Sequence, residues 1–206
     1  MRSRLSWRSK HVGAPPRRAM LNIWDANWGL ELDLCPCDLH FVEYLAEARI
    51  KGATIFHFGY GGHHLVGAEC AKAEQGNVVM SITASPQEHA AYERLIIESP
   101  AIAHSYVCYF GDIYTFNGRL MPPFDIVTAF HLCEFRTEAN DAYGALSDWE
   151  LLEALCKQTR PGGRVVFYRG SDGWQKTVPL IERAVEAGLL RDDGEFKTLR
   201  IMRRVD

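Results

Sequence analysis

The sequence lacks the features that mark several classes of protein. No apolar run approaches the roughly 20 residues that a membrane-spanning helix needs. The formal net charge is −3, which argues against the basic surface of a dedicated nucleic-acid binder. The six cysteines are spread along 206 residues and do not form the framework of a small secreted domain. We therefore expect a cytoplasmic protein with no membrane or nucleic-acid partner.

Acidic residues are missing from the first 24 positions, which nevertheless hold six basic residues. The rest of the chain has 17 basic and 26 acidic residues, so the charge is unevenly distributed. We interpret residues 1–24 as a flexible basic arm; a transit peptide or an arm for an acidic partner are the alternatives. Residues 25–206 are expected to form one domain, because two domains of this total length would each be small.

From residue 54 onward, short apolar segments alternate with helix-length segments. This alternation is typical of a doubly wound, mostly parallel sheet, and it predicts an α/β fold. The strands are expected at residues 54–58, 78–83, 105–110, 124–130 and 164–168, with a terminal strand pair near 195–204.

Helix starts are marked by local capping patterns. Ser85-Pro86-Gln87-Glu88 and Ser147-Asp148-Trp149-Glu150 both read as capping boxes. A further helix is expected over residues 38–49, with Asp38 as its N-cap. Before it, residues 21–34 are predicted to be an irregular cover segment. Its Trp24 and Trp28 are expected in the core, with closure over a ligand as the alternative.

Two features of the sequence could bind a ligand. The strand 54–58 runs into Gly59-Tyr60-Gly61-Gly62, a glycine-rich turn before a helix, as in βαβ nucleotide-binding units. Cys35, Cys37 and His40 could also be imagined as zinc ligands. Their spacing is not that of a standard zinc site, so ordinary buried thiols are the preferred interpretation and no metal is expected.

The order of these signals resembles the class I S-adenosylmethionine (SAM)-dependent methyltransferase family over about residues 38–206. The motifs that carry the resemblance are His57-Phe58-Gly59-Tyr60-Gly61-Gly62, Ser85-Pro86, Gly111-Asp112, Phe124-Asp125-Ile126-Val127 with Phe130-His131, and Arg160-Pro161-Gly162-Gly163-Arg164. The resemblance implies a seven-stranded sheet with an antiparallel last strand, and SAM as the cofactor. It also implies cofactor contacts from His57, Gly59, Tyr60, Gly61, Thr83, Asp112, Ile113 and Phe130.

The chain departs from the family pattern at three positions. His57 stands where an acidic residue usually ends the first strand, and His63 where a third glycine is common. Thr83 stands where an acidic residue usually binds the ribose hydroxyls. A threonine replaces only part of that interaction, because charge-assisted hydrogen bonds are roughly twice as strong as neutral ones.

By analogy with the family, the best-placed candidates for chemistry are His131 and Glu134, just past the fourth strand. A histidine there could act as the base that removes a proton from the acceptor, with His63 and His64 as second choices. A structural role for any of these histidines is the alternative.

The leading hypothesis is methyl transfer from SAM to an oxygen or nitrogen of a small-molecule acceptor. A non-catalytic methyltransferase-like partner protein is the first alternative, because the usual acidic residues are absent at positions 57 and 83. An NAD(P)-dependent oxidoreductase is the least favoured, because the third glycine and the acidic residue after the second strand are missing. A homodimer is left open.

Overall fold

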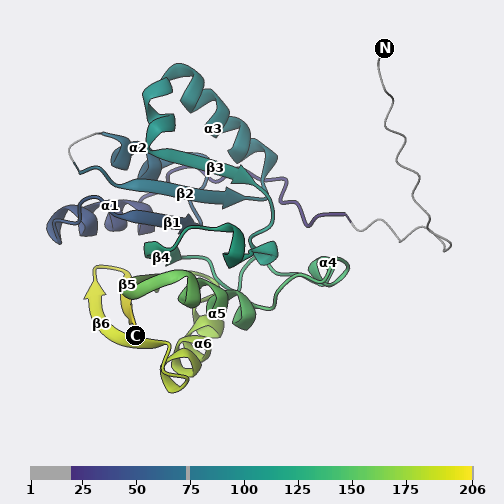
Figure 1. Cartoon of the computed structure of the whole chain (residues 1–206). Coiled ribbons are helices and arrows are strands. Elements are labelled where there is room, and N and C mark those ends of the chain that lie inside the picture. Colours follow the sequence, from purple (N-terminus) through teal and green to yellow (C-terminus); the bar gives the residue numbers. More distant parts are fainter. Residues whose placement is uncertain (1–19, 73–74, 206) are drawn as a thin grey trace, which may run out of the picture.

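The computed structural model describes residues 20–72 and 75–205. In this part of the chain, seven strands form one sheet in the order β3-β2-β1-β4-β5-β7-β6 (Figure 1). The strands are β1 (Thr54–Phe58), β2 (Val78–Thr83), β3 (Tyr106–Phe110), β4 (Phe124–Ala129), β5 (Thr159–Tyr168), β6 (Leu190–Phe196) and β7 (Leu199–Arg204). The α-helices are α1 (Cys37–Glu47), α2 (Leu65–Ala71), α3 (Pro86–Glu98), α4 (Glu138–Asp141), α5 (Asp148–Gln158) and α6 (Trp174–Glu186).

The strand directions confirm the predicted fold class. Strands β1 to β5 pair in parallel, while β7 is antiparallel to both β5 and β6. The chain reverses its direction along the sheet between β1 and β4. In open parallel sheets, ligands bind at such a switch point, beyond the carboxyl ends of the strands.

Two apolar cores form because successive strand residues face opposite sides of the sheet. Phe56 and Val127 face the side covered by α5 and α6. Ile55 and Ile126, one position away, face the side covered by α1, α2 and α3. Helices on both faces make the sheet central to the molecule and leave its carboxyl edge for a site.

The predicted helix starts have three different outcomes. Ser147 and Glu150 form the complete capping box of α5. Ser85 caps α3, but the Glu88 side chain turns away from the cap toward Thr83. The prediction for Asp38 is wrong, because Pro36 is the N-cap of α1 and Asp38 lies buried inside the first turn. The sequence pattern could not show that this carboxylate faces histidines of another element.

Strand β5 begins earlier than predicted. It starts at Thr159 and contains the Pro-Gly-Gly segment that we expected as a turn before the strand. The pairing with β4 jumps from Phe124↔Thr159 to Ile126↔Arg164, so the extra residues are absorbed as an irregularity. Gly162 provides the positive φ of 73° that this irregularity requires.

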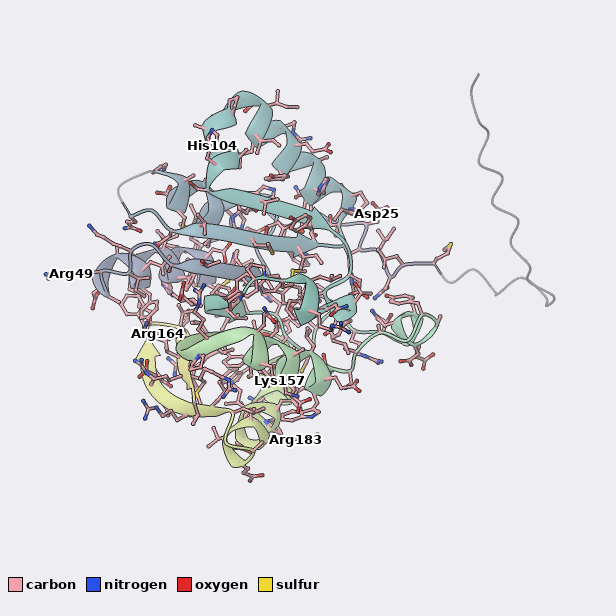
Figure 2. The ribbon with its side chains drawn as sticks, in the orientation of Figure 1. Asp25, Arg49, His104, Lys157, Arg164 and Arg183 are labelled. Atoms are coloured by element: carbon pink, nitrogen blue, oxygen red, sulfur yellow. The ribbon has the colours of Figure 1, made fainter. Side chains whose placement is uncertain are left out.

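Charged side chains lie on the outside of the molecule, as Arg49, Lys157 and Arg183 show (Figure 2). Of the helices in the described ranges, none combines the length and the apolar character needed to cross a membrane. The described part of the predicted basic arm, residues 20–24, contacts the body of the domain. Asn22, for example, donates a hydrogen bond to the carbonyl of Phe135. The rest of the arm lies outside the described residues.

Candidate functional site

A cavity of about 400 Å³ lies at the carboxyl edge of the sheet, at the switch point. This volume falls within the range of small-molecule sites. Residues after β1, β2 and β3 line one part, which we call the β1–β3 half. Residues after β4 and β5, with Cys35 and Cys37, line the other, which we call the β4–β5 half.

The predicted glycine turn forms the floor of the cavity. Gly59 has a φ of 97°, and a Cβ there would lie 2.5 Å from Cδ2 of His131. Gly61 has a φ of 55°, and a Cβ there would lie 2.8 Å from the carbonyl oxygen of Trp28. Both positions therefore require glycine, and both line the cavity as the sequence predicts.

Two predicted cofactor contacts lie beneath the turn rather than along the cavity. His57 is fully buried, and its Nδ1 lies 2.7 Å from Oγ1 of Thr128. Phe130 packs edge-on against His57, with ring centroids 5.6 Å apart. Neither residue is part of the cavity lining, so the structure gives both a supporting position.

A carboxylate does occupy the region below the glycine turn, but it comes from α1. Asp38 is buried, with Oδ1 lying 3.4 Å from Nε2 of His57 and Oδ2 lying 3.6 Å from Nε2 of His63. A carboxylate from a neighbouring helix thus lies next to position 57, although it does not line the cavity. Two imidazoles lie beside the buried carboxylate, but neither Oδ2 of Asp38 nor Nε2 of His57 has a hydrogen-bond partner among the described residues.

Tyr60 places its ring along the cavity, while its hydroxyl points into the core. The hydroxyl lies 2.6 Å from Sγ of Cys108. Burial raises the pKa of Tyr60 well above its usual value, so the phenol stays neutral. The hydroxyl of Tyr60 is therefore not available to a ligand.

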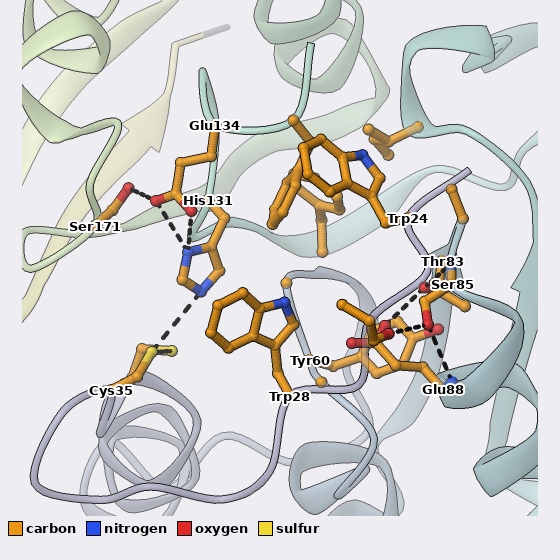
Figure 3. A pocket seen from close by; sticks show the side chains of 18 of the residues that line it. Trp24, Trp28, Cys35, Tyr60, Thr83, Ser85, Glu88, His131, Glu134 and Ser171 are labelled. Atoms are coloured by element: carbon orange, nitrogen blue, oxygen red, sulfur yellow. Dashed lines mark hydrogen bonds and ion pairs between the residues drawn. The ribbon is translucent and has the colours of Figure 1, made fainter. Parts of the chain in front are cut away.

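The β1–β3 half contains a carboxylate that we did not predict as a site residue. Thr83 donates a hydrogen bond from Oγ1 to Oε2 of Glu88, at 2.7 Å. Glu88 is buried and lines the cavity beside Thr83 (Figure 3). Burial raises the pKa of Glu88, and the bond from Thr83 opposes that shift. A carboxylate from α3 therefore stands next to the position where the family has one at the end of β2.

Asp112 lines the same half together with Ile113, as the resemblance implies. Its Oδ2 accepts hydrogen bonds from Nδ2 of Asn140 at 2.7 Å and from the hydroxyl of Tyr143 at 2.5 Å. Its Oδ1 accepts from the backbone N–H of Tyr114 at 3.0 Å. These three neutral donors fix the carboxylate at the edge of the cavity.

The β4–β5 half brings His131 and Glu134 together, with one partner that the sequence analysis did not connect to them. Nδ1 of His131 lies 3.0 Å from Glu134, and Nε2 lies 3.8 Å from Sγ of Cys35 (Figure 3). Glu134 also accepts hydrogen bonds from the Ser171 hydroxyl and, at 3.2 Å, from the backbone N–H of Gly173. The imidazole is thus held at both nitrogens.

This geometry changes the charge state of the pair. Burial favours a neutral His131, but the hydrogen bonds with Cys35 and Glu134 outweigh it and raise its pKa to about 10. The pKa of Cys35 falls to about 5, chiefly because Cys37 donates a hydrogen bond to it. Both pKa shifts favour a thiolate at Cys35 and an imidazolium at His131. A protonated His131 does not accept a proton, which argues against a simple general-base role.

Residues 20–36 cross the carboxyl edge of the sheet as a strap over the cavity. The backbone N–H of Trp24 donates to the carbonyl of Ala84, and that of Gly62 donates to the carbonyl of Trp28. Trp24 and Trp28 are 36% and 63% exposed, so the expectation that both belong to the core is wrong. They line the cavity instead, where Trp28 lies between the His131 group and the Glu88 group in Figure 3.

Sequence reasoning interpreted Cys35 as an ordinary buried thiol, and it missed both Glu88 and the contact of Asp38 with two histidines, for a common reason. Each belongs to a local pattern that explains it without a site: a pair of thiols or the first turn of a helix. Their partners are distant in sequence, and Cys35 and His131 are 96 positions apart. The sequence does contain one useful signal, which is the absence of carboxylates at positions 57 and 83. That absence indicates that acidic side chains from other elements lie near these positions.

Comparison with solved structures agrees with this architecture. The O-methyltransferase TomG from Streptomyces achromogenes, solved in complex with SAM, matches at a TM-score of 0.55 and 15% identity; the match covers 84% of this chain and 83% of that one. The chain has the class I SAM-methyltransferase fold. A putative O-methyltransferase from Klebsiella pneumoniae shares this fold at a TM-score of 0.55 and 12% identity, over 81% of this chain and 79% of that one.

A third match is TrmN from Thermus thermophilus, with a TM-score of 0.54 and 17% identity over 80% of this chain. The match covers 47% of TrmN, and this chain spans about half the length of several solved structures that it matches. Neither a protein-family model nor a curated protein matches the sequence. At these identities the matches show the class I methyltransferase fold alone.

Proposed function

We propose that the protein is a SAM-dependent methyltransferase that acts on a small-molecule acceptor. The observation that carries the proposal is the cavity at the switch point, with Gly59 and Gly61 below it and two buried carboxylates, Glu88 and Asp112, along its β1–β3 half. The class I methyltransferase fold and the SAM bound to TomG support SAM as the cofactor.

The β1–β3 half suits the nucleoside part of SAM. We propose that Glu88, oriented by Thr83, accepts the ribose hydroxyls, and that Asp112 and Ile113 meet the adenine. Gly59, Tyr60 and Gly61 would then contact the methionine part. The sulfonium methyl would point toward the β4–β5 half, where His131 and Glu134 belong to the acceptor side. An oxygen or nitrogen acceptor held in line with the methyl gains most of its acceleration from that positioning.

The proposal is tested by calorimetric titration of the whole chain with SAM and S-adenosylhomocysteine. We expect binding in the micromolar range, and Glu88→Gln should weaken it by roughly 10- to 30-fold because a charge-assisted hydrogen bond is lost. Glu93→Gln is the matched control, since Glu93 is exposed on the same helix. No binding to the unaltered protein at millimolar ligand contradicts the proposed function.

A second variant separates this proposal from a decayed, non-catalytic site. If the site had decayed at position 83, Thr83→Asp would restore SAM affinity. In the structure, that carboxylate would lie beside the buried Glu88, because Oγ1 of Thr83 is 2.7 Å from it. We therefore expect Thr83→Asp to weaken SAM binding. Tighter binding would favour the decayed site and count against Glu88 as the ribose ligand.

A further inference from the structure

Three groups that bind metals meet at the edge of the β4–β5 half. Sγ of Cys35 lies 3.5 Å from Sγ of Cys37 and 3.8 Å from Nε2 of His131. All three atoms lie within 4.8 Å of one another. The two thiols come from the strap and the first residue of α1, while the imidazole follows β4, so the fold itself creates the cluster.

The two distances from Sγ of Cys35 are close to the edges of a tetrahedron around a metal ion. Zinc binds cysteine sulfur at about 2.3 Å and histidine nitrogen at about 2.0–2.1 Å, which places two sulfurs about 3.8 Å apart and sulfur and nitrogen about 3.6 Å apart. A disulfide would need the two sulfurs at about 2.05 Å. The observed distances match the metal geometry much more closely than the disulfide.

The second ring nitrogen of His131 has the partner that a metal ligand requires. Nδ1 lies 3.0 Å from Glu134, which is itself fixed by Ser171 and by the backbone of Gly173. Metal-binding histidines almost always donate this other N–H to a carboxylate, a carbonyl or water, which fixes the ring orientation. Nε2 is thereby directed toward the two thiols.

We propose that Cys35, Cys37 and His131 bind one Zn²⁺ ion, with a fourth coordination position that opens into the cavity. Two thiolates and an imidazole favour zinc over hard cations such as Mg²⁺ or Ca²⁺. Each ligand residue lines the cavity, which provides the path of entry and leaves room for a non-protein ligand. Three protein ligands and one open position are the arrangement of catalytic rather than structural zinc sites.

The open position also suggests a role, which rests on the proposed methyl transfer. A hydroxyl acceptor bound to the zinc would lose its proton to solvent, because the metal would lower its pKa. The resulting anion attacks the methyl: the bond from acceptor to carbon forms, the carbon–sulfur bond breaks, and its electron pair neutralises the sulfonium. His131 then serves as a metal ligand, and Glu134 as the residue that positions it.

The same atoms could instead make Cys35 a nucleophile assisted by His131. Substitution of Cys37 distinguishes the zinc site from this nucleophile. A zinc site needs the Cys37 thiolate, so Cys37→Ser should abolish tight zinc binding. A nucleophilic Cys35 needs His131 and a hydrogen-bond donor at position 37, which a serine hydroxyl also provides. Cys37→Ser should then leave the alkylation of Cys35 by iodoacetamide rapid and independent of added zinc.

Zinc binding is measured on the whole chain, stripped with a chelator under reducing conditions and titrated with Zn²⁺ against a chromophoric chelator. We expect one ion per chain, and a loss of affinity of at least about 100-fold in Cys35→Ser, Cys37→Ser and His131→Ala, since each removes one of three protein ligands. Cys70→Ser and His40→Ala are the matched controls. Cys70 is a buried thiol in α2, and Nδ1 of His40 lies 2.8 Å from Thr198 rather than near the cluster.

Cobalt provides a readout that does not depend on activity. Co²⁺ bound to the unaltered protein should show thiolate charge-transfer absorption and tetrahedral ligand-field bands, and both should be lost in Cys35→Ser. Absence of stoichiometric zinc binding, or its retention in Cys37→Ser, overturns the proposal. SAM binding to the metal-free protein is titrated separately, so failure of the zinc site and failure of the proposed function give different results.

Discussion

The polar groups in the two halves of the cavity have different kinds of partner. In the β1–β3 half, neutral donors serve the carboxylates: Thr83 for Glu88, and Asn140 and Tyr143 for Asp112. In the β4–β5 half, Cys35 and His131 lie next to Glu134, and their pKa shifts favour a thiolate and an imidazolium. The first half is complete before any ligand arrives and suits a nucleoside. The second concentrates charge around a small space and suits a cation or a reacting group.

The largest expected effect comes from Gly59→Ala, which breaks the junction between the halves. The new Cβ would lie 2.5 Å from Cδ2 of His131, and Gly59 already has a φ of 97°. Strain and overpacking should together lower the free energy of unfolding by about 3–4 kcal/mol. Urea denaturation measures this loss.

Gly52→Ala is the control for Gly59→Ala, because Gly52 has a φ of 66° but nothing within 4 Å of the Cβ position. It should cost only the strain, about 1–2 kcal/mol. Equal losses in the two variants would show that His131 is not held against the turn.

The next largest effect is a pH dependence that comes from His64, which lies just after the glycine turn. Nε2 of buried His64 lies 2.9 Å from the carbonyl of Glu88, so it carries the hydrogen, and Nδ1 accepts from the Tyr106 hydroxyl at 2.7 Å. Burial is the main reason that the pKa of His64 falls from 6.5 to about 4. Between these values the unfolded chain binds the extra proton, so stability falls as the pH drops through this window.

The loss from His64 should approach roughly 3 kcal/mol at the acid end of the window. Urea denaturation between pH 7 and pH 4 measures it, and His64→Gln should flatten the slope. The raised pKa of Glu88 acts in the opposite sense but is common to both proteins. An unchanged slope in His64→Gln would contradict a buried, neutral His64.

The smallest expected effect is Tyr143→Phe, which removes one of the donors to Asp112. The same hydroxyl accepts the backbone N–H of Asn22 at 3.2 Å, so it also holds the strap. We expect a loss of about 1 kcal/mol of stability, typical of one hydrogen bond, and faster proteolysis within residues 20–36. Tyr109→Phe, on a half-exposed ring of β3, should change neither measurement.

The fold was predictable from the sequence because its strands are short apolar runs that turn and helix-capping residues separate. Strand β1 was expected at residues 54–58 and β2 at 78–83, and both lie there in the structure. Periodicity and capping are local, so they show which segments form elements. The resemblance then supplied the number of strands in the sheet and the antiparallel last strand.

The site was only partly predictable, because its chemistry depends on contacts between distant residues. Gly59, Gly61 and Asp112 line the cavity where the motifs place them. The turning of Glu88 away from the cap, and the reach of Asp38 to His57, depend on packing between elements. No local pattern distinguishes a carboxylate that caps a helix from one that faces a cavity.

The strap determines where the chain can be truncated without loss of the site. The resemblance to methyltransferases begins near residue 38, so a truncation designed from that resemblance would keep every strand and helix except the start of α1. It would also remove both thiols of the cluster, both tryptophans over the cavity and the backbone groups that hold the glycine turn from above. Such a fragment would keep the methyltransferase sheet but leave His131 facing an open, solvent-filled edge.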